Sequence, residues 1–265
     1  MPRMSLPNGI ELDYFDHGPR DGKPVILLHG WTDSWRIWEQ AFPFFSPELR
    51  IICPSHRGFG DSSKPALGYA MKDFVDDCIA LANSLGLENF ALGGHSMGGF
   101  ISHQVAVENP QRVTHLILIG TGTTGYGKPA FHEEAIGIEN FPDPLTEEFV
   151  RRAQTDGMRL APSKACLDTV IFESLKSPKF VWAASWIGMQ QENHAHLLSE
   201  IDIPTLIMCG DDDIYFPLQE QYELRDAIAG SQLKLYGGIG HGLQWEIPEI
   251  FAHDLSAFVL DRFHT

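Results

Sequence analysis

The sequence is poor in basic residues and in cysteine. It has 19 lysine and arginine residues against 35 aspartate and glutamate residues, a formal net charge of -16. This charge repels phosphate backbones and anionic lipid surfaces, and no local basic cluster reverses it, so we expect neither nucleic acid nor a membrane as a partner. The four cysteines, Cys53, Cys78, Cys166 and Cys209, contain no C-x-x-C pair and predict neither a disulfide framework nor a zinc site.

Long apolar runs and internal repeats are absent as well. No stretch of about 18 apolar residues occurs, and the segment MPRMSLPNGIELDYFDHG lacks the apolar core of a secretory signal. These absences favour a cytoplasmic protein. The 265 residues, 43% of them hydrophobic, suffice for one large core, and we expect a monomer or homodimer.

Short apolar runs alternate along the chain with segments that have helical boundaries. Near-continuous apolar runs of five or six residues are typical of strands buried on both faces of a parallel sheet. The sequence therefore predicts an α/β fold with a mostly parallel central sheet and helices on both faces. An Asn-Gly pair within residues 5–12 predicts a hairpin before the sheet. The predicted strands are residues 25–30, 50–55, 90–94, 116–120, 205–210 and 233–237, and the predicted helices include 71–86, 217–230 and 248–262.

One interval is too long for a simple connection. More than eighty residues separate the fourth of these strands from the fifth, and structureless loops of that length are rare in compact domains. Thr146 and Ser163 have the side chains of helix N-caps, and a third helical segment follows Pro178. We therefore predict a helical cap, residues 123–199, over the carboxyl ends of the strands, inserted between core residues 1–122 and 200–265.

Ser96 lies in the run FALGGHSMGGF, between a predicted strand and a predicted helix. A serine at such a turn, with glycines two positions before and two after it, is typical of a nucleophile elbow. Small neighbours relieve the crowding of a strained turn that pushes the hydroxyl into the open. Gly94-His95-Ser96-Met97-Gly98 therefore predicts a catalytic serine, with an ordinary glycine-rich turn as the alternative.

A serine nucleophile needs a base and an acid that orients the base. His241 lies between two glycines in the loop before the last predicted helix, and we predict that it is the base. Asp211, Asp212 and Asp213 follow a predicted strand and cannot all point into one site. The residues alone leave the choice among these three acids open.

These residues, together with HGW at 29–31 and HRGFGDSSKP at 56–65, resemble the α/β-hydrolase superfamily over nearly the whole chain. The closest resemblance is to its branch of cofactor-free haloperoxidase-type esterases and perhydrolases, which implies the α/β-hydrolase fold and no cofactor. In that branch the acid lies in a pattern like G-x-x-D-x-x-x-P, here Gly210, Asp213 and Pro217. The resemblance thus implies Asp213 as the acid, with Asp211 in reserve.

The resemblance also implies an oxyanion hole made by the backbone N–H groups of Trp31 and Met97. A tetrahedral intermediate needs such donors where its negative charge develops. Arg57 is assigned to structural hydrogen bonding in the loop after the second core strand. The family often has an acid two residues before this arginine, whereas this chain has Ser55.

The predicted substrate pocket combines core and cap residues. Trp182, Trp186 and Met189 recur at helical spacing and form one apolar stripe, which serves packing, substrate contact or both. Trp31 and His95 are placed in the same pocket. The acidic balance and the lack of basic clamps favour a neutral, largely apolar small molecule as substrate.

The sequence predicts a serine hydrolase that cleaves a carboxylic ester or lactone through an acyl-enzyme. An epoxide hydrolase or haloalkane dehalogenase of this fold would have aspartate in place of Ser96. Perhydrolysis, hydrolytic C–C bond cleavage and a receptor function with the same triad are the alternatives. No metal is expected, because the H-x-H pair of His194 and His196 lacks an evident third ligand.

Overall fold

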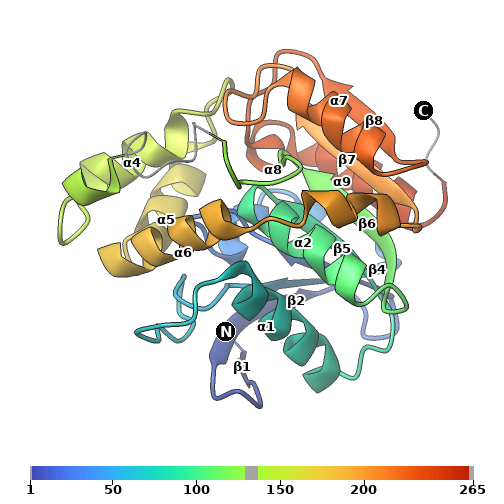
Figure 1. Ribbon diagram of the computed structural model, residues 1–265, viewed down its shortest axis with the longest axis horizontal. Helices are drawn as coiled ribbons and strands as arrows, with labels where there is room; N and C mark the ends of the chain where they lie inside the picture. The colour runs from blue at the N-terminus through green and yellow to red at the C-terminus, as the bar shows by residue number, and fades with distance from the viewer. Residues whose placement is uncertain (1, 129–136, 263–265) are drawn as a thin grey trace.

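The computed structural model describes residues 2–128 and 137–262 and contains an eight-stranded sheet in the order β1-β2-β4-β3-β5-β6-β7-β8 (Figure 1). β1 and β2 form an antiparallel hairpin, β2 is antiparallel to β4, and the remaining neighbours are parallel. The predicted hairpin and the mostly parallel sheet are therefore confirmed. The strands are β1 (Arg3–Ser5), β2 (Glu11–His17), β3 (Lys23–Leu28), β4 (Leu49–Pro54), β5 (Phe90–His95), β6 (Val113–Ile119), β7 (Thr205–Gly210) and β8 (Gln232–Tyr236).

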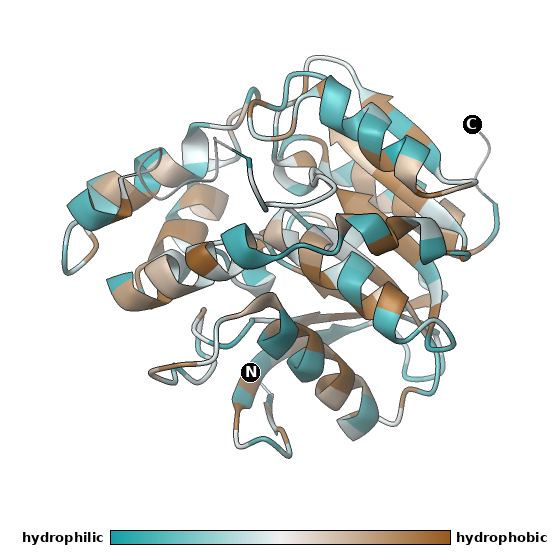
Figure 2. Ribbon diagram, viewed as in Figure 1, coloured by the Kyte–Doolittle hydropathy of each residue, from teal (hydrophilic) through white to brown (hydrophobic). Residues whose placement is uncertain are grey.

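The central strands are apolar on both faces. In β3, Val25 and Leu27 join the core on one side of the sheet, whereas Ile26 and Leu28 join the core on the other side. Because successive side chains alternate across a strand, one fully apolar strand contributes to two cores. Figure 2 shows these hydrophobic strands between helices that carry hydrophilic residues on their outer sides.

Helices cover both faces of the sheet. On one face α1 and α2 pack together, with Phe74 and Phe100 in the core that contains Ile26. On the other face Phe251 of α9 stacks on Trp38, with 5.8 Å between ring centroids. No helix within the described residues is long and apolar enough to cross a membrane. The helices are α1 (Met71–Ser84), α2 (Met97–Glu108), α4 (Glu147–Thr155), α5 (Lys164–Ser174), α6 (Lys179–Gln191), α7 (Leu218–Ala227), α8 (Leu243–Glu246) and α9 (Pro248–Val259), with short 3-10 helices η1 (Trp35–Trp38), η2 (Phe42–Phe44), η4 (Ile138–Asn140) and η5 (Ala195–Glu200).

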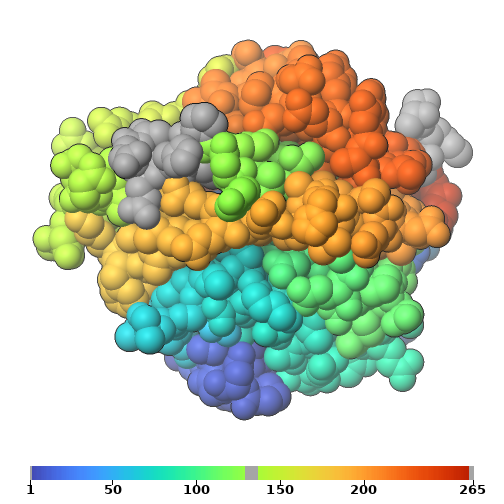
Figure 3. All heavy atoms as spheres, viewed as in Figure 1, coloured from blue at the N-terminus to red at the C-terminus, as the bar shows by residue number. Residues whose placement is uncertain are grey.

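The long interval between β6 and β7 contains η4, α4, α5, α6 and η5. Thr146 Oγ1 accepts the N–H of Phe149 at 3.3 Å and Ser163 Oγ accepts that of Cys166 at 3.2 Å, which confirms both predicted N-caps. In Figure 1, α4, α5 and α6 lie beside the sheet, and Figure 3 shows α6 and η5 crossing the surface between α1 and α2 on one side and α7 on the other. The assignment of residues 123–199 to a cap, and of 1–122 and 200–265 to a core, stays a proposal; residues 129–136 lie outside the described ones.

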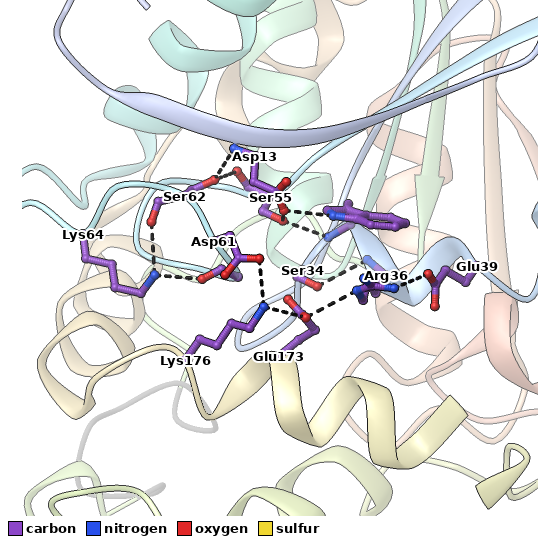
Figure 4. Close-up of polar contacts among 12 residues, drawn as sticks. Asp13, Ser34, Arg36, Glu39, Ser55, Asp61, Ser62, Lys64, Glu173 and Lys176 are labelled. Carbon is purple, nitrogen blue, oxygen red and sulfur yellow. Dashed lines mark hydrogen bonds and ion pairs between the residues drawn. The ribbon is translucent and has the colours of Figure 1, made fainter. Parts of the chain in front are cut away.

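Ion pairs hold the end of α5 against the core (Figure 4). Lys176 Nζ lies 2.9 Å from Asp61 and 2.8 Å from Glu173, and the Glu173 carboxylate lies 3.3 Å from Arg36 Nε. Glu173 is buried, so both cations compensate for the loss of water around its charge. The cluster joins α5 to the segments after β3 and β4, and the segment after β3 also carries site residues.

Arg57 makes the structural contacts expected of it, with α1 as its main partner. Its Nε and Nη2 each donate to the Asp77 carboxylate at 2.6 Å, and Nη1 donates to the Gly68 carbonyl at 3.1 Å. Burial would lower the pKa of Arg57, but the Asp77 carboxylate outweighs it and raises that pKa. Ser55, where the family often has an acid, instead accepts the N–H of Trp35 at 3.2 Å.

Candidate active site

Ser96 is the residue at which β5 ends and α2 begins. Its backbone has φ 53° and ψ -117°, in a region that non-glycine residues rarely occupy. A Cβ atom at Gly94 would lie 2.0 Å from the carbonyl oxygen of Gly98, and one at Gly98 would lie 2.3 Å from the last carbonyl oxygen of β3, so the turn requires both glycines. The Ser96 N–H donates to Ile119 at 2.9 Å and the Thr121 hydroxyl donates to the Ser96 carbonyl at 3.0 Å. Hydrogen bonds with Ile119 and Thr121 thus hold Ser96 in its strained backbone conformation.

His241 and Asp213 form a hydrogen-bonded pair, with 2.8 Å between His241 Nδ1 and Asp213 Oδ2. Asp213 Oδ1 accepts the N–H groups of Tyr215 at 2.9 Å and Phe216 at 3.1 Å. Burial on its own would raise the pKa of Asp213, but His241 and these amides outweigh it and lower that pKa. Burial likewise disfavours the imidazolium, yet the Asp213 carboxylate outweighs it and raises the pKa of His241. The Asp213 carboxylate thus stabilises the charged form of His241, so the imidazole is suited to accept a proton.

The two neighbouring acids have other partners. Asp211 Oδ1 accepts the N–H of Gly238 at 2.7 Å, and Asp212 Oδ2 lies 2.8 Å from Arg159 Nε. Both residues are exposed, whereas Asp213 is 4% exposed. Of the three consecutive acids, Asp213 is the one that contacts His241.

The loop after β3 carries Trp31, the first predicted oxyanion donor. His29 anchors this loop, because its Nε2 accepts the N–H of His56 at 2.8 Å. Burial lowers the pKa of His29 well below its usual range, which keeps the ring neutral and Nε2 able to accept. Thr32, the residue after Trp31, has φ 75°. Met97, the second predicted donor, is the first residue of α2, where N–H groups have no acceptor within the helix. Both backbone amides remain predicted donors.

A cavity of about 320 Å³ lies at the carboxyl ends of the strands, because residues that follow β3, β5, β7 and β8 all line it. Four of the predicted pocket residues contribute to its wall, namely Trp31, His95, Trp186 and Met189, together with Ser96 and His241. The interval between β6 and β7 adds Phe141, Phe149, Arg152, Gln154, Asp156 and Met158. The wall is therefore largely aromatic and apolar. The charged side chains of Arg152, in α4, and Asp156, directly after α4, lie at the exposed side of the wall.

Trp182, the fifth predicted pocket residue, is not among the lining residues of this cavity. It is fully buried, its ring lies 5.3 Å from that of Trp31, and its carbonyl accepts the Trp31 indole N–H at 3.0 Å. Trp186, one turn later, lies 4.6 Å from the Trp31 ring and reaches the cavity. The predicted stripe is therefore divided: Trp182 supports Trp31 from behind, and Trp186 and Met189 face the cavity.

Sequence reasoning misses Asp33 and Gln154, which form a polar part of the cavity wall. Gln154 Nε2 donates to Asp33 Oδ1 at 2.9 Å and lies 3.0 Å from Thr32 Oγ1 and 2.9 Å from Ser174 Oγ. Burial raises the pKa of Asp33 to about 7, even though the bond from Gln154 lowers it. The position of Asp33, two residues after Trp31, is a usable signal in the sequence, whereas nothing in the sequence singles out Gln154.

Of the H-x-H pair, His194 is buried and His196 is exposed. His194 contacts His103 and Glu192, and all three side chains are buried. Burial lowers the pKa of His103 well below its usual range. Within residues 2–128 and 137–262, no three His, Cys, Asp or Glu side chains are arranged to hold a metal ion.

The sequence matches the family described as alpha/beta hydrolase fold over residues 23–159 and 172–248. Relatives match over nearly the full length of the chain. A non-heme chloroperoxidase of Streptomyces lividans is 28% identical (98% of this chain, 99% of the relative), and a 2-hydroxymuconate semialdehyde hydrolase of Pseudomonas sp. is 27% identical (98% and 94%). A bifunctional esterase/perhydrolase of Acinetobacter calcoaceticus is 25% identical (98% and 99%).

Solved structures agree with this match. A bromoperoxidase from Bacillus anthracis has a TM-score of 0.86 at 26% identity, covering 98% of this chain and 100% of that one. A thermophilic esterase from Thermogutta terrifontis has a TM-score of 0.83 at 26% identity and covers 100% of both chains. The fold predicted from the sequence, an α/β-hydrolase fold, is therefore confirmed.

Proposed function

Because this chain belongs to the α/β hydrolase fold family, we propose that it is a serine hydrolase that cleaves a carboxylic ester or lactone of a small molecule. It is a hydrolase of the haloperoxidase-type branch. The observation that supports the proposal most directly is the cavity that Ser96 and His241 share, with Asp213 bonded to the far side of the imidazole. Serine, base and acid are the parts that acyl transfer needs.

In the proposed reaction, His241 Nε2 removes the proton of Ser96 Oγ while Oγ bonds to the substrate carbonyl carbon. The carbonyl π electrons move to oxygen, and the N–H groups of Trp31 and Met97 stabilise that oxyanion. The intermediate collapses, the bond to the alcohol oxygen breaks, and His241 gives its proton to that oxygen. Water then attacks the acyl-enzyme with His241 as base, which releases the acid and restores Ser96.

Asp213 contributes electrostatically in this scheme. Its Oδ2 accepts the Nδ1–H of His241, which leaves Nε2 unprotonated and directed away from the acid. Its Oδ1 is held by two backbone amides, so the carboxylate keeps its orientation while His241 gains and loses charge. The raised pKa of His241 follows from the same pairing and favours proton transfer from serine.

The cavity wall supports an acyl or alcohol group with apolar surface. Trp31, Trp186 and Met189 supply that surface, and burial of apolar groups against such walls is the usual source of small-molecule affinity. We assign Trp186 and Met189 to a cap, residues 123–199, that selects the substrate. Arg152 and Asp156 lie on the exposed side of the wall, so they add no charge to the deep apolar part of the cavity.

Perhydrolysis and C–C bond hydrolysis are the alternatives that the relatives favour, since one is named an esterase/perhydrolase and another a semialdehyde hydrolase. Both reactions would use Ser96 and His241 in the same cavity. They differ from ester hydrolysis in the attacking or leaving group. Peroxide-dependent product formation, or cleavage of a vinylogous 1,5-diketone, would therefore identify them.

The test is multiple-turnover kinetics on p-nitrophenyl acetate, aryl lactones and the same esters with hydrogen peroxide. Ser96→Ala and His241→Ala should each lower kcat by about 10³-fold or more while the fold is retained. Ser84→Ala, an exposed serine at the end of α1, is the matched control. Unchanged turnover in folded Ser96→Ala would exclude the mechanism, and a single turnover in the native protein would favour the receptor function.

A further inference from the structure

His241 lies in a loop that contributes few side chains to its own packing. Residues 237–242, between β8 and α8, contain four glycines, and Gly238 has φ 72°. A glycine-rich loop has more conformational freedom than other loops, whereas a base must stay within hydrogen-bond reach of the proposed nucleophile, Ser96. The loop therefore needs partners outside itself.

Glu246, the last residue of α8, supplies one such partner. Its Oε1 accepts the N–H of Gly242 at 3.1 Å and that of Gly240 at 3.2 Å. The carboxylate thus binds the amides directly before and directly after His241. Glu246 is 9% exposed, so water competes little for these hydrogen bonds.

The same carboxylate binds the segment that follows α4. Its Oε2 accepts the N–H of Arg159 at 2.9 Å and that of Leu160 at 2.8 Å. A further link joins this segment to the loop of the base, because the His241 N–H donates to the Gly157 carbonyl at 2.9 Å. Gly157 lines the cavity. Glu246 therefore fixes the loop of the base against a part of the cavity wall.

These contacts require two acceptor oxygens in one side chain. Both oxygens of Glu246 accept N–H groups, Oε1 from the loop of the base and Oε2 chiefly from the segment after α4. A glutamine has the same length, but it presents one oxygen and one NH2 group, and the NH2 group cannot accept. In Glu246→Gln, either the loop of the base or the segment after α4 therefore loses its acceptor.

We propose that Glu246 is a positioning residue for the proposed base: it holds the His241 loop and the cavity wall in one fixed arrangement, in which the imidazole reaches Ser96. Glu246 is not among the residues that line the cavity, so it acts through His241 and not on the substrate. The role rests on the proposed esterase function. It adds a side chain outside the cavity to the three on which that function depends.

The charge of Glu246 also acts on His241. Burial disfavours the imidazolium, whereas nearby carboxylates, Asp213 most strongly and Glu246 to a smaller extent, raise the pKa of His241. Removal of the charge at Glu246 should lower that pKa. The acid limb of the kcat/KM profile, which reports the free base, should then move to lower pH. The other titratable groups that face the imidazole stay in place, namely Asp33, His95, Asp213 and Tyr215.

The test is steady-state kinetics of folded variants on p-nitrophenyl acetate. Glu246→Gln should lower kcat by about tenfold or more, because a misplaced base slows proton transfer, and should move the acid limb to lower pH. Glu246→Asp keeps the charge but is one methylene group shorter, so it should lower kcat and leave the acid limb close to its native position. Asp77→Asn, which weakens the buried ion pair with Arg57 outside the cavity wall, is the control: Tm should fall while kcat changes less than about twofold.

A double variant distinguishes positioning of the base from general destabilisation. In the His241→Ala background, Glu246→Gln should lower the residual kcat by less than about twofold, because the loop no longer carries a base. A further tenfold loss in that background, or native kcat in folded Glu246→Gln, would overturn the role. If Glu246→Gln does not fold, Glu246→Asp replaces it in both comparisons of kcat. Equal turnover by the native protein and His241→Ala would instead refute the esterase proposal itself.

Discussion

Asp33→Asn should stabilise the protein, and more so as the pH rises. Burial raises the pKa of Asp33 from 3.8 to about 7, with the Gln154 bond and the charge of His241 acting against burial. Between these values the folded chain keeps the proton and the unfolded chain has lost it, so the free energy of unfolding falls by about 1.4 kcal/mol per pH unit. From pH 5 to pH 8 the loss is about 3 kcal/mol. Asparagine carries no titrating proton, so the variant escapes this loss.

The assay is urea unfolding of the native protein and Asp33→Asn at pH 5 and pH 8, followed by tryptophan fluorescence. The gain in unfolding free energy on substitution should be about 3 kcal/mol larger at pH 8 than at pH 5. The other titratable groups that line the cavity with Asp33 are common to both proteins, namely His95, Arg152, Asp156, Tyr215 and His241. Asp156→Asn, measured in parallel, shows how far any Asp-to-Asn change alters the pH dependence. A gain that is the same at both pH values would refute a protonated Asp33.

Three further outcomes test the site. Asp213→Asn should lower kcat on p-nitrophenyl acetate by about 10³-fold or more, since His241 loses its orienting carboxylate, whereas Asp212→Asn should change kcat less than twofold; similar effects of both would mean that Asp213 is not the acid. Trp186→Ala should change the ratio of kcat/KM for a bulky aryl ester to kcat/KM for p-nitrophenyl acetate, by a factor equivalent to about 1 to 3 kcal/mol. An equal loss for both esters, together with a lowered Tm, would make Trp186 a packing residue. Gln154→Ala should lower kcat about tenfold on small and bulky esters alike, because the loop before Asp33 loses its support; a change confined to KM would contradict that role.

Local sequence signals predicted most of the fold. The run FALGG gave the strand that is β5, Phe90–His95, and the glycines around Ser96 gave the turn that follows it. The N-cap hydroxyls of Thr146 and Ser163 predicted the starts of α4 and α5, because an N-cap hydrogen bond spans only a few residues. Each of these features depends on neighbours in the chain, so the sequence alone contains the information.

Contacts between distant segments were beyond such signals. Gln154 and Asp33 are 121 residues apart and come together only when α4 reaches the loop after β3. The helical spacing of Trp182 and Trp186 predicted a common face, but a spacing cannot tell which tryptophan reaches the cavity and which one packs behind Trp31. The buried pairing of Arg57 with α1 depends in the same way on tertiary packing.

The cavity is also identified by the unfavourable features that collect around it, without reference to any motif. Of the three non-glycine residues with positive φ in the described chain, Thr32 and Ser96 both line this cavity, and such backbone strain costs about 1–3 kcal/mol at each position. Asp33, next to Thr32, adds a buried acid with a raised pKa. Folded proteins have a net stability of only about 5–15 kcal/mol, so several such costs in one wall are large in proportion. Strain and perturbed acids concentrate where chemistry requires them, which makes the wall formed by Thr32, Asp33 and Ser96 the place where substitutions toward stability should cost activity.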